Sequence, residues 1–452
     1  MSPVLSELFR TREPSAIRVA GLRFAERGDD TRAINVAIGN VSLPMHPAMI
    51  ERLDNLRAPG SPFEKGVVAY TATGGTPEAN RAFLHVLASS GFDPEGIHCQ
   101  ITQGGSEAME LIVAGVCGPP ASGERPLLLI DAAYTNYTAF AERLGRATVS
   151  ITRELGEDGK FTLPDLEDIE RVIVREKPGA LVVIPYDNPT GQFFPQESLV
   201  ELARLCVKHD LWIVSDEAYR ELYYVEGEAC SIWAIGEDEV PGIRGRRIGI
   251  DSSSKVWNAC GLRIGGLLTD NAEFHRRATA EHTASLCPSA IGQWIFAALN
   301  DVPPAELRAW YARQRDYYRS MLHDFTSRTR ELLPDAIVSS PDAALYSVVD
   351  VRRMAPDFDA LEFVLWCASE ASVAIDGEPH TLLVAPMAGF YDLPADENPG
   401  RTQMRIAYVV PPADMAKVPD LLAALLEQWL ERTAGAGRGA ASRGTSGRAR
   451  RA

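Results

Sequence analysis

The stretch Asp251-Ser-Ser-Ser-Lys-Val-Trp-Asn-Ala-Cys-Gly-Leu-Arg-Ile-Gly-Gly266 places a single lysine, Lys255, between small hydroxyl residues and a Gly-Leu-Arg sequence. Lysine is scarce in this chain, with six lysines among the 45 lysines and arginines. Arginine cannot form a Schiff base, whereas lysine can once its amine has lost a proton. Lys255 is therefore a candidate covalent anchor for a carbonyl cofactor. On this segment alone, a surface lysine at the end of a strand fits equally well.

Outward from this stretch, short apolar runs alternate with segments of helical periodicity. The strand candidates are 127–130, 147–151, 181–184, 211–214 and 247–250, and the helix candidates are 77–90, 106–116 and 196–209. This alternation predicts an α/β fold whose mostly parallel sheet is covered by helices on both faces. Ligands of such sheets bind at the carboxyl ends of the strands, so residues that directly follow these runs are candidate site residues.

We expect the chain to divide into four parts. Residues 1–60 form an N-terminal arm and part of a small domain, residues 61–302 form a large domain, and residues 303–432 form a smaller α+β domain. Residues 433–452 contain no large apolar side chain and cannot bury surface, so this tail is predicted to be disordered. The small domain has strand candidates at 34–38, 336–339, 346–351 and 404–409 and helices over 305–332 and 415–432.

Composition excludes several classes of protein. The 452 residues carry a net charge of −16, which argues against nucleic acid as the main partner. Seven cysteines without CxxC spacing predict reduced thiols in the cytoplasm and no metal site. The first residues show no signal peptide, and no apolar run reaches the roughly 18 residues that a membrane span needs.

Four further segments follow strand candidates and carry polar or aromatic side chains. Thr102-Gln-Gly-Gly-Ser-Glu-Ala108 is a glycine-rich turn that enters a helix, which favours a phosphate but also suits a simple tight turn. Asp131-Ala-Ala-Tyr-Thr-Asn-Tyr137 offers an aromatic ring that could cover a planar cofactor, although a lone tyrosine more often packs in a core.

The other two segments add an amide and a carboxylate. Ile184-Pro-Tyr-Asp-Asn-Pro-Thr-Gly191 is a turn by its residue types alone. Trp212-Ile-Val-Ser-Asp-Glu-Ala-Tyr219 ends a buried strand in Asp216, and a carboxylate there is costly unless a cation or a protonated ring nitrogen meets it. In chain order, the segments therefore supply a phosphate cradle, an aromatic lid, an amide, a carboxylate and an amine.

These segments together resemble the fold type I pyridoxal-phosphate (PLP) enzymes, specifically the class I/II aminotransferase family typified by aspartate aminotransferase. The resemblance covers roughly residues 30–430. Its most specific part is the ordered combination of Asn188-Pro-Thr-Gly, Asp216-Glu-Ala-Tyr219 and Ser252-Ser-Ser-Lys255 with Arg263. Each motif alone is weak evidence, but all three in this order are strong evidence.

The resemblance implies a role for each of these residues. Lys255 would bind PLP as a Schiff base and move a proton at the substrate α-carbon. Asp216 would keep the pyridine nitrogen protonated. Asn188 and Tyr219 would donate to the ring 3-oxygen, and Tyr134 would stack on the ring.

The phosphate and the substrate have further expected partners. The resemblance assigns the phosphate to Ser106, Glu107 (through its backbone N–H), Ser252, Ser254 and Arg263. It assigns Tyr70 to the phosphate of the neighbouring subunit, which implies a homodimer with shared active sites. Arg405 would bind the substrate α-carboxylate beside Asn188 and Gly39, although a surface arginine at a strand edge remains the plain alternative.

The implied function is a PLP-dependent aminotransferase that moves an α-amino group from an amino acid to a 2-oxo acid. The same family scaffold also supports β/γ-elimination, replacement and cyclising reactions, including those on S-adenosylmethionine, so this alternative stays open. A non-catalytic regulator is a remote alternative. Such regulators carry an N-terminal DNA-binding domain, whereas this chain is acidic and its resemblance to the PLP domain begins by about residue 30.

The chain departs from the family at Gly39-Asn-Val-Ser-Leu-Pro44, where an acidic residue followed by proline is usual. A second arginine for a dicarboxylate is not obvious, although Arg18, Arg23 or Arg401 could serve. The substrate and the pathway therefore stay open at this point.

Overall fold

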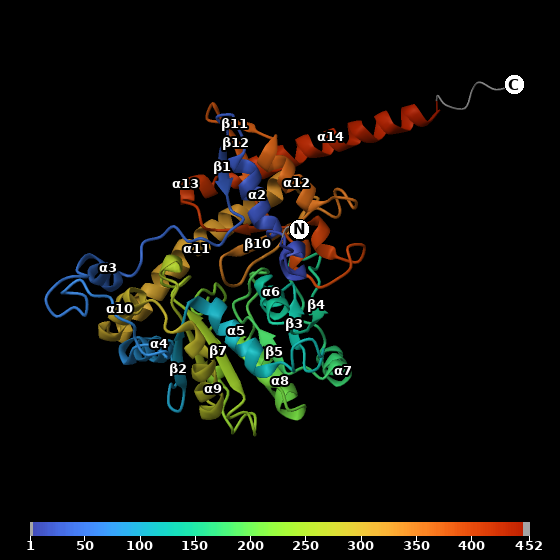
Figure 1. Ribbon diagram of the computed structural model, residues 1–452. Helices are drawn as coiled ribbons and strands as arrows, with labels where there is room; N and C mark the ends of the chain where they lie inside the picture. The colour runs from blue at the N-terminus through green and yellow to red at the C-terminus, as the bar shows by residue number, and fades with distance from the viewer. Residues whose placement is uncertain (1–2, 446–452) are drawn as a thin grey trace.

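The computed structural model describes residues 3–445 and is built around a seven-stranded sheet (Figure 1). The strand order is β2-β8-β7-β6-β5-β3-β4, and neighbours are parallel except at β8, which runs antiparallel to β2 and β7. The strands are β2 (His98–Thr102), β3 (Leu127–Asp131), β4 (Thr148–Thr152), β5 (Ala180–Val183), β6 (Trp212–Asp216), β7 (Arg247–Ser252) and β8 (Gly265–Thr269). The predicted mostly parallel α/β architecture is confirmed.

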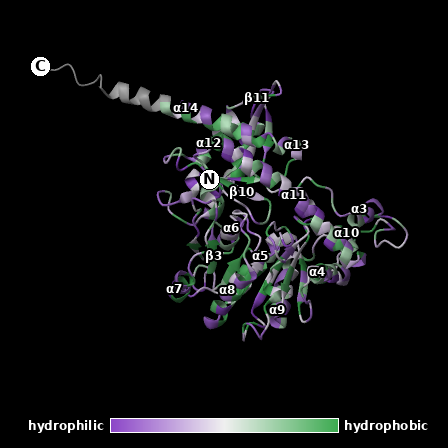
Figure 2. Ribbon diagram, turned by 180° about the vertical axis from the view of Figure 1, so that it is seen from behind, coloured by the Kyte–Doolittle hydropathy of each residue, from purple (hydrophilic) through white to green (hydrophobic). Residues whose placement is uncertain are grey.

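Helices cover both faces of this sheet. Successive residues of a strand point to opposite sides, so the apolar side chains on both sides need to be covered. Leu128 and Leu181 belong to one buried cluster, and Leu129 and Val182 belong to another. Burial on both faces explains why the central strands β3 and β5 are nearly continuous apolar runs (Figure 2). The helices of this part are α4 (Pro77–Ser89), α5 (Gly104–Val116), α6 (Asn136–Arg143), α7 (Leu166–Glu176), α8 (Gln196–Lys208), α9 (Ala272–His282) and α10 (Ala290–Phe296).

A smaller part of the structure is assembled from both ends of the chain and lies above the large sheet in Figure 1. Its first sheet pairs β1 (Arg32–Asn35) in parallel with β12 (Glu378–Leu383), and β12 also pairs with β11 (Val373–Ile375). Its second sheet has the order β13-β14-β10-β9, with β9 (Ile337–Val338), β10 (Tyr346–Asp350), β13 (Ala385–Pro386) and β14 (Gln403–Ala407). The remaining helices are α1 (Glu7–Thr11), α2 (Ala16–Ala25), α3 (Pro47–Asp54), α11 (Pro304–Leu332), α12 (Ala360–Ser369), α13 (Pro412–Met415) and α14 (Val418–Thr445). The four-part division itself stays a prediction.

The C-terminal helix is longer than the sequence analysis expects. Helix α14 continues through Thr445, past the helix end predicted at residue 432. Extending an existing helix costs much less than starting one, which offsets the poor helix propensity of the four glycines at 435, 437, 439 and 444. The predicted disorder of residues 433–452 stays a prediction. Residues 446–452, the rest of the predicted tail, lie outside the described residues.

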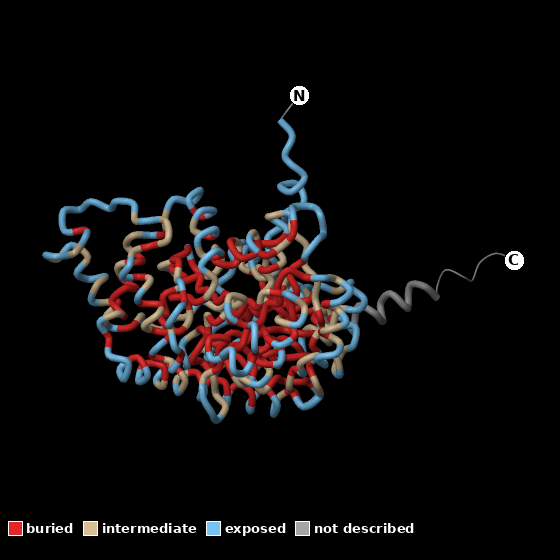
Figure 3. The backbone as a smooth tube through the Cα atoms, turned by 90° about the horizontal axis from the view of Figure 1, so that it is seen from below, coloured by how far each residue is buried: buried red, intermediate tan, exposed pale blue. Residues whose placement is uncertain are grey.

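Buried residues concentrate in the interior, and exposed loops surround them (Figure 3). Among residues 3–445, no helix is both long and apolar enough to cross a lipid bilayer. The same residues include no group of three or more His, Cys, Asp or Glu side chains placed to bind a metal ion.

Candidate active site

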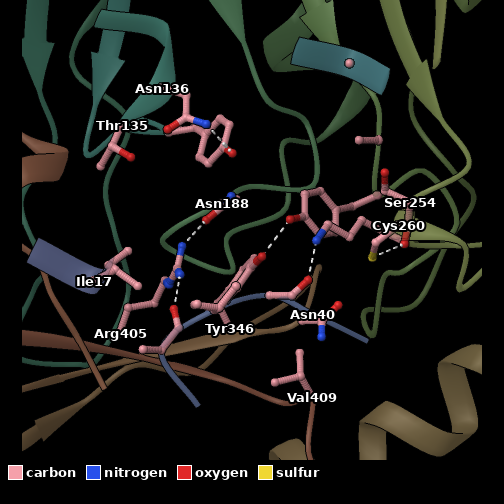
Figure 4. A pocket seen from close by; sticks show the side chains of 18 of the residues that line it. Ile17, Asn40, Thr135, Asn136, Asn188, Ser254, Cys260, Tyr346, Arg405 and Val409 are labelled. Atoms are coloured by element: carbon pink, nitrogen blue, oxygen red, sulfur yellow. Dashed lines mark hydrogen bonds between the residues drawn. The ribbon is translucent and has the colours of Figure 1, made fainter. Parts of the chain in front are cut away.

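Most of the predicted site residues line one cavity of about 950 Å³. The residues that line it include eleven from the sequence analysis: Gly39, Ser106, Tyr134, Asn188, Asp216, Tyr219, Ser252, Ser254, Lys255, Arg263 and Arg405. They come from the carboxyl ends of the large-sheet strands and from the smaller sheets, as Figure 4 shows for part of the set. The fold therefore brings these segments together at the carboxyl ends of the strands, where the sequence analysis expects a site.

Lys255 projects into this cavity. Its Nζ donates to the backbone oxygen of Gly39 and lies 5.9 Å from the centre of the Tyr219 ring. Within the described chain, no carboxylate forms an ion pair with this amine. The amine thus lines the cavity and is not held in a salt bridge.

Asp216 ends strand β6 and faces the same cavity. Its Oδ2 accepts a hydrogen bond from the Tyr137 hydroxyl at 2.5 Å, and its Oδ1 accepts one from the backbone N–H of Ala218 at 3.1 Å. Burial raises the pKa of this carboxyl, and the hydrogen bond from Tyr137 lowers it. No lysine, arginine or histidine of residues 3–445 pairs with Asp216, so a protonated ring nitrogen would supply the missing positive partner.

Arg405 lies in β14 and is only 3% exposed, which rules out the alternative of a surface arginine. Its Nη1 donates to Asn188 Oδ1 and its Nη2 donates to the backbone oxygen of Ala37, each at 2.7 Å (Figure 4). The rings of Tyr346 and Phe390 lie 4.4 Å and 5.0 Å from the guanidinium carbon. The buried Nε has no hydrogen-bond partner within residues 3–445, no carboxylate of these residues pairs with the guanidinium, and Arg405 lines the cavity, so the site has a cation to offer a carboxylate.

Two tyrosines of the site escape the sequence analysis as functional residues. Tyr346 begins β10, lines the cavity, and its hydroxyl lies 2.6 Å from that of Tyr219. Tyr137 follows Tyr134 by three residues and packs edge-on against its ring, with centroids 5.5 Å apart. Tyr137 lies in the first turn of α6, whereas Tyr134 precedes that helix, so helical spacing does not link them, and no local signal identifies Tyr346.

The first turn of helix α5 forms an anion cradle with Arg263. Helix α5 begins at Gly104, and its first backbone N–H groups have no partner within the helix. Gly104 has a φ of +76°, a conformation that favours glycine, and its missing side chain leaves room for the Arg263 guanidinium beside the helix start. The Oγ atoms of Ser252 and Ser254 lie 2.8 Å apart at the cavity wall. Arg263 forms no ion pair in the described part of the chain, so the arrangement fits a phosphate.

Two predicted residues do not line the cavity. The side chain of Glu107 accepts from the backbone N–H of Gln103 at 2.7 Å and lies 3.1 Å from His282, which leaves only its backbone for the cradle. Tyr70 is 80% exposed. Its expected role in a neighbouring subunit stays a prediction.

One of the three candidate arginines for a second substrate carboxylate lines the cavity. Arg18, in helix α2, is exposed and has no ion-pair partner within residues 3–445. Arg23 pairs with Glu26 at 3.5 Å on the surface, and Arg401 does not line the cavity.

The family model for aminotransferase class I and II matches residues 34–389. The chain belongs to this aminotransferase family. Enzymes of the class I and II family use PLP, and the cradle, the unpaired Asp216 and the free amine of Lys255 fit that cofactor. The protein is therefore a PLP-dependent aminotransferase, as the sequence analysis predicts.

Individual relatives of this aminotransferase agree in fold and class. An aspartate/prephenate aminotransferase of Thermus thermophilus is 27% identical over 364 residues, which is 78% of this chain and 86% of the relative. A 2-aminoadipate transaminase of Thermus thermophilus is 31% identical over 52% of this chain and 55% of the relative. The structure of N-succinyldiaminopimelate aminotransferase from Mycobacterium tuberculosis has a TM-score of 0.77 at 22% identity and covers 94% of this chain and all of that one. These names favour transamination over the elimination, replacement or cyclising alternative.

Proposed function

We propose that this protein transfers the α-amino group of an amino acid to a 2-oxo acid, with Lys255 as the covalent anchor and proton carrier. The observation that supports this proposal most directly is the shared cavity of Lys255 and Arg405. One group is a free amine, and the other is a buried guanidinium with an unpartnered Nε. An α-amino acid has the carboxylate that Arg405 lacks as a partner.

Each residue has a defined task in this proposal. Bound PLP supplies an aldehyde that reacts with amines and a ring that takes up electrons. Asp216 would hold a proton on the ring nitrogen, and Asn188 and Tyr219 would donate to the ring 3-oxygen. Arg405 would bind the α-carboxylate and so position the α-carbon. Lys255 would lose its bond to the cofactor when the substrate amine takes its place, and its freed Nζ could then carry the α-proton.

We also propose a homodimer in which Tyr70 completes the neighbouring phosphate cradle. In support, Val67 is 62% and Val68 is 57% exposed beside Tyr70, in the segment between α3 and α4 that projects from the body (Figure 3). Such a run of exposed apolar side chains is typical of an interface. The free cysteines agree with a proposed cytoplasmic location.

Mixing two inactive variants tests the shared site. Tyr70→Ala and Lys255→Ala should each have little activity alone. A mixture should regain activity, because a hybrid dimer has one site with both native side chains. Failure of the mixture to regain activity, with hybrid dimers shown by native mass spectrometry, would contradict the shared site.

A half-reaction screen tests the transaminase assignment. The purified protein with PLP is incubated with each of the common amino acids, and mass spectrometry follows conversion of PLP to pyridoxamine phosphate and of the amino acid to its 2-oxo acid. We expect both products from at least one amino acid and none from Lys255→Ala. Loss of a side-chain leaving group without pyridoxamine phosphate would instead support the elimination or replacement reaction.

A further inference from the structure

Arg153 is a buried cation that lies outside the cavity but contacts two of the loops that form it. It directly follows β4, is 2% exposed, and forms an ion pair with Asp187 at 2.5 Å. Its Nη2 also donates to the backbone oxygens of Ala132 at 2.7 Å and Ile130 at 3.3 Å, and its Nε donates to that of Asp131 at 3.4 Å. A charge buried this deeply is tolerated only with such partners, so its position is closely defined.

One set of contacts leads from Arg153 to the turn that carries Asn188. Asp187 is fully buried, and its Oδ2 also accepts from the Thr190 hydroxyl at 2.6 Å. The next residue, Asn188, accepts from Arg405 Nη1 at 2.7 Å. The ion pair therefore fixes the backbone from which Asn188 reaches Arg405.

A second set of contacts leads from Arg153 to the other side of Arg405. Arg153 holds the three backbone oxygens of residues 130–132. The adjoining Ala133 donates its backbone N–H to the Phe390 oxygen at 2.9 Å, and the Phe390 ring faces the Arg405 guanidinium. Arg153 thus connects to Arg405 through two independent routes.

We infer that Arg153 is a positioning residue for the substrate carboxylate: it touches no substrate atom but sets the orientation of Arg405 through Asn188 and Phe390. The inference rests on the proposed binding of the α-carboxylate by Arg405. It differs from a purely stabilising role for the Arg153–Asp187 pair, because it predicts a specific loss of carboxylate affinity in a protein that still folds and binds PLP.

The test removes both charges of the pair, since removing only one would leave an unpaired buried charge. The variant is Arg153→Met/Asp187→Asn. The matched control is Arg247→Met/Asp270→Asn, which removes another largely buried ion pair with an N···O distance of 2.8 Å. Arg247 begins β7, at the end of the strand that lies away from the cavity. Thermal unfolding, PLP affinity and calorimetric binding of straight-chain monocarboxylates from acetate to hexanoate are measured on each PLP-loaded protein.

We expect the Arg153→Met/Asp187→Asn variant to bind the carboxylates about ten- to a hundredfold more weakly, the range typical of residues coupled in one network. The control should stay within about twofold of wild type. In an Arg405→Lys background, the two further substitutions should have much less effect, since Arg153 acts through Arg405. Arg153→Lys, which keeps the charge but not the fork that holds three carbonyls, should lie between wild type and the double variant.

Wild-type carboxylate affinity in the Arg153→Met/Asp187→Asn variant would overturn the inference, as would an equal loss in the control. If that variant does not fold, Arg153→Lys decides, and unchanged carboxylate affinity there would overturn the inference. Transamination by the wild-type protein, measured alongside, separates the two proposals. If wild type transaminates while the Arg153 variants bind normally, only the positioning role fails. If wild type neither binds carboxylates nor transaminates, the proposed function fails as well.

Discussion

Replacement of Tyr137 by phenylalanine should disturb Asp216 without changing the shape of the site. The Tyr137 hydroxyl donates a 2.5 Å hydrogen bond to Asp216 Oδ2 and lowers the pKa of this carboxyl against the effect of burial. A hydrogen bond to an ionised group contributes about 1.5–3 kcal/mol. Loss of that bond corresponds to a roughly ten- to hundredfold weaker stabilisation of the charged carboxylate.

The sign of the pH effect follows from this hydrogen bond. Without the Tyr137 donor, the pKa of Asp216 rises further, so the carboxyl takes up its proton at a higher pH. The acidic limb of the activity profile should therefore shift to higher pH in Tyr137→Phe, and the affinity for PLP should fall. The shift should persist across substrates, because Asp216 is proposed to face the ring nitrogen of the cofactor and not the amino acid.

The assay is a pH profile of kcat/KM together with PLP dissociation, measured for wild type, Tyr137→Phe and a control. The control is Tyr408→Phe, which removes another buried hydroxyl, 2.6 Å from Ser347 Oγ and outside the cavity lining. It should leave the acidic limb unchanged. An acidic limb and a PLP affinity equal to wild type in Tyr137→Phe would refute the role of this hydrogen bond.

Three further predictions concern other residues of the site and its surroundings. Arg405→Lys should raise KM about ten- to hundredfold, since lysine cannot form the forked pair, and steady-state kinetics with an unchanged KM would contradict this. Arg18→Gln should lower kcat/KM for acidic amino acids by at most about fivefold, the limit for an exposed ion pair, while neutral amino acids, assayed in parallel, stay unchanged. His46 is fully buried, and burial lowers its pKa below the usual 6.5. Its contribution to the free energy of unfolding should therefore be complete above pH 6.5 and decrease as the pH falls below that value. Urea titrations of His46→Asn should lack this decrease.

The sequence predicts the site well because parallel strands bring their carboxyl ends to one edge. Motifs after β3, β5, β6 and β7 are far apart in the chain, yet all line one cavity. Each local pattern leaves Asn188, Asp216 and Lys255 open when taken alone, and it is their order along the chain, together with the family resemblance, that selects them.

The features that the sequence does not predict depend on contacts between distant residues. Tyr219 and Tyr346, whose hydroxyls lie 2.6 Å apart, are 127 positions apart in the chain. Strand β8 escapes prediction because its first residues, Gly265 and Gly266, are typical of turns. The structure explains the first of these glycines, since a Cβ on Gly265 would collide with the backbone where helix α5 begins. No periodicity in the sequence contains that information.

Two of the charged groups that line the cavity, Asp216 and Arg405, are buried or partly buried and opposite in sign, and neither has an oppositely charged partner within residues 3–445. Asp216 has only hydrogen bonds from Tyr137 and Ala218, and Arg405 has only neutral oxygens and two aromatic rings. Removing an ion from water without a counter-ion costs several kcal/mol, so this arrangement is unfavourable for stability on its own. A protonated ring nitrogen and a carboxylate together compensate both charges. These unpaired groups therefore fit PLP and an α-amino acid, whose ring nitrogen and carboxylate would be their partners.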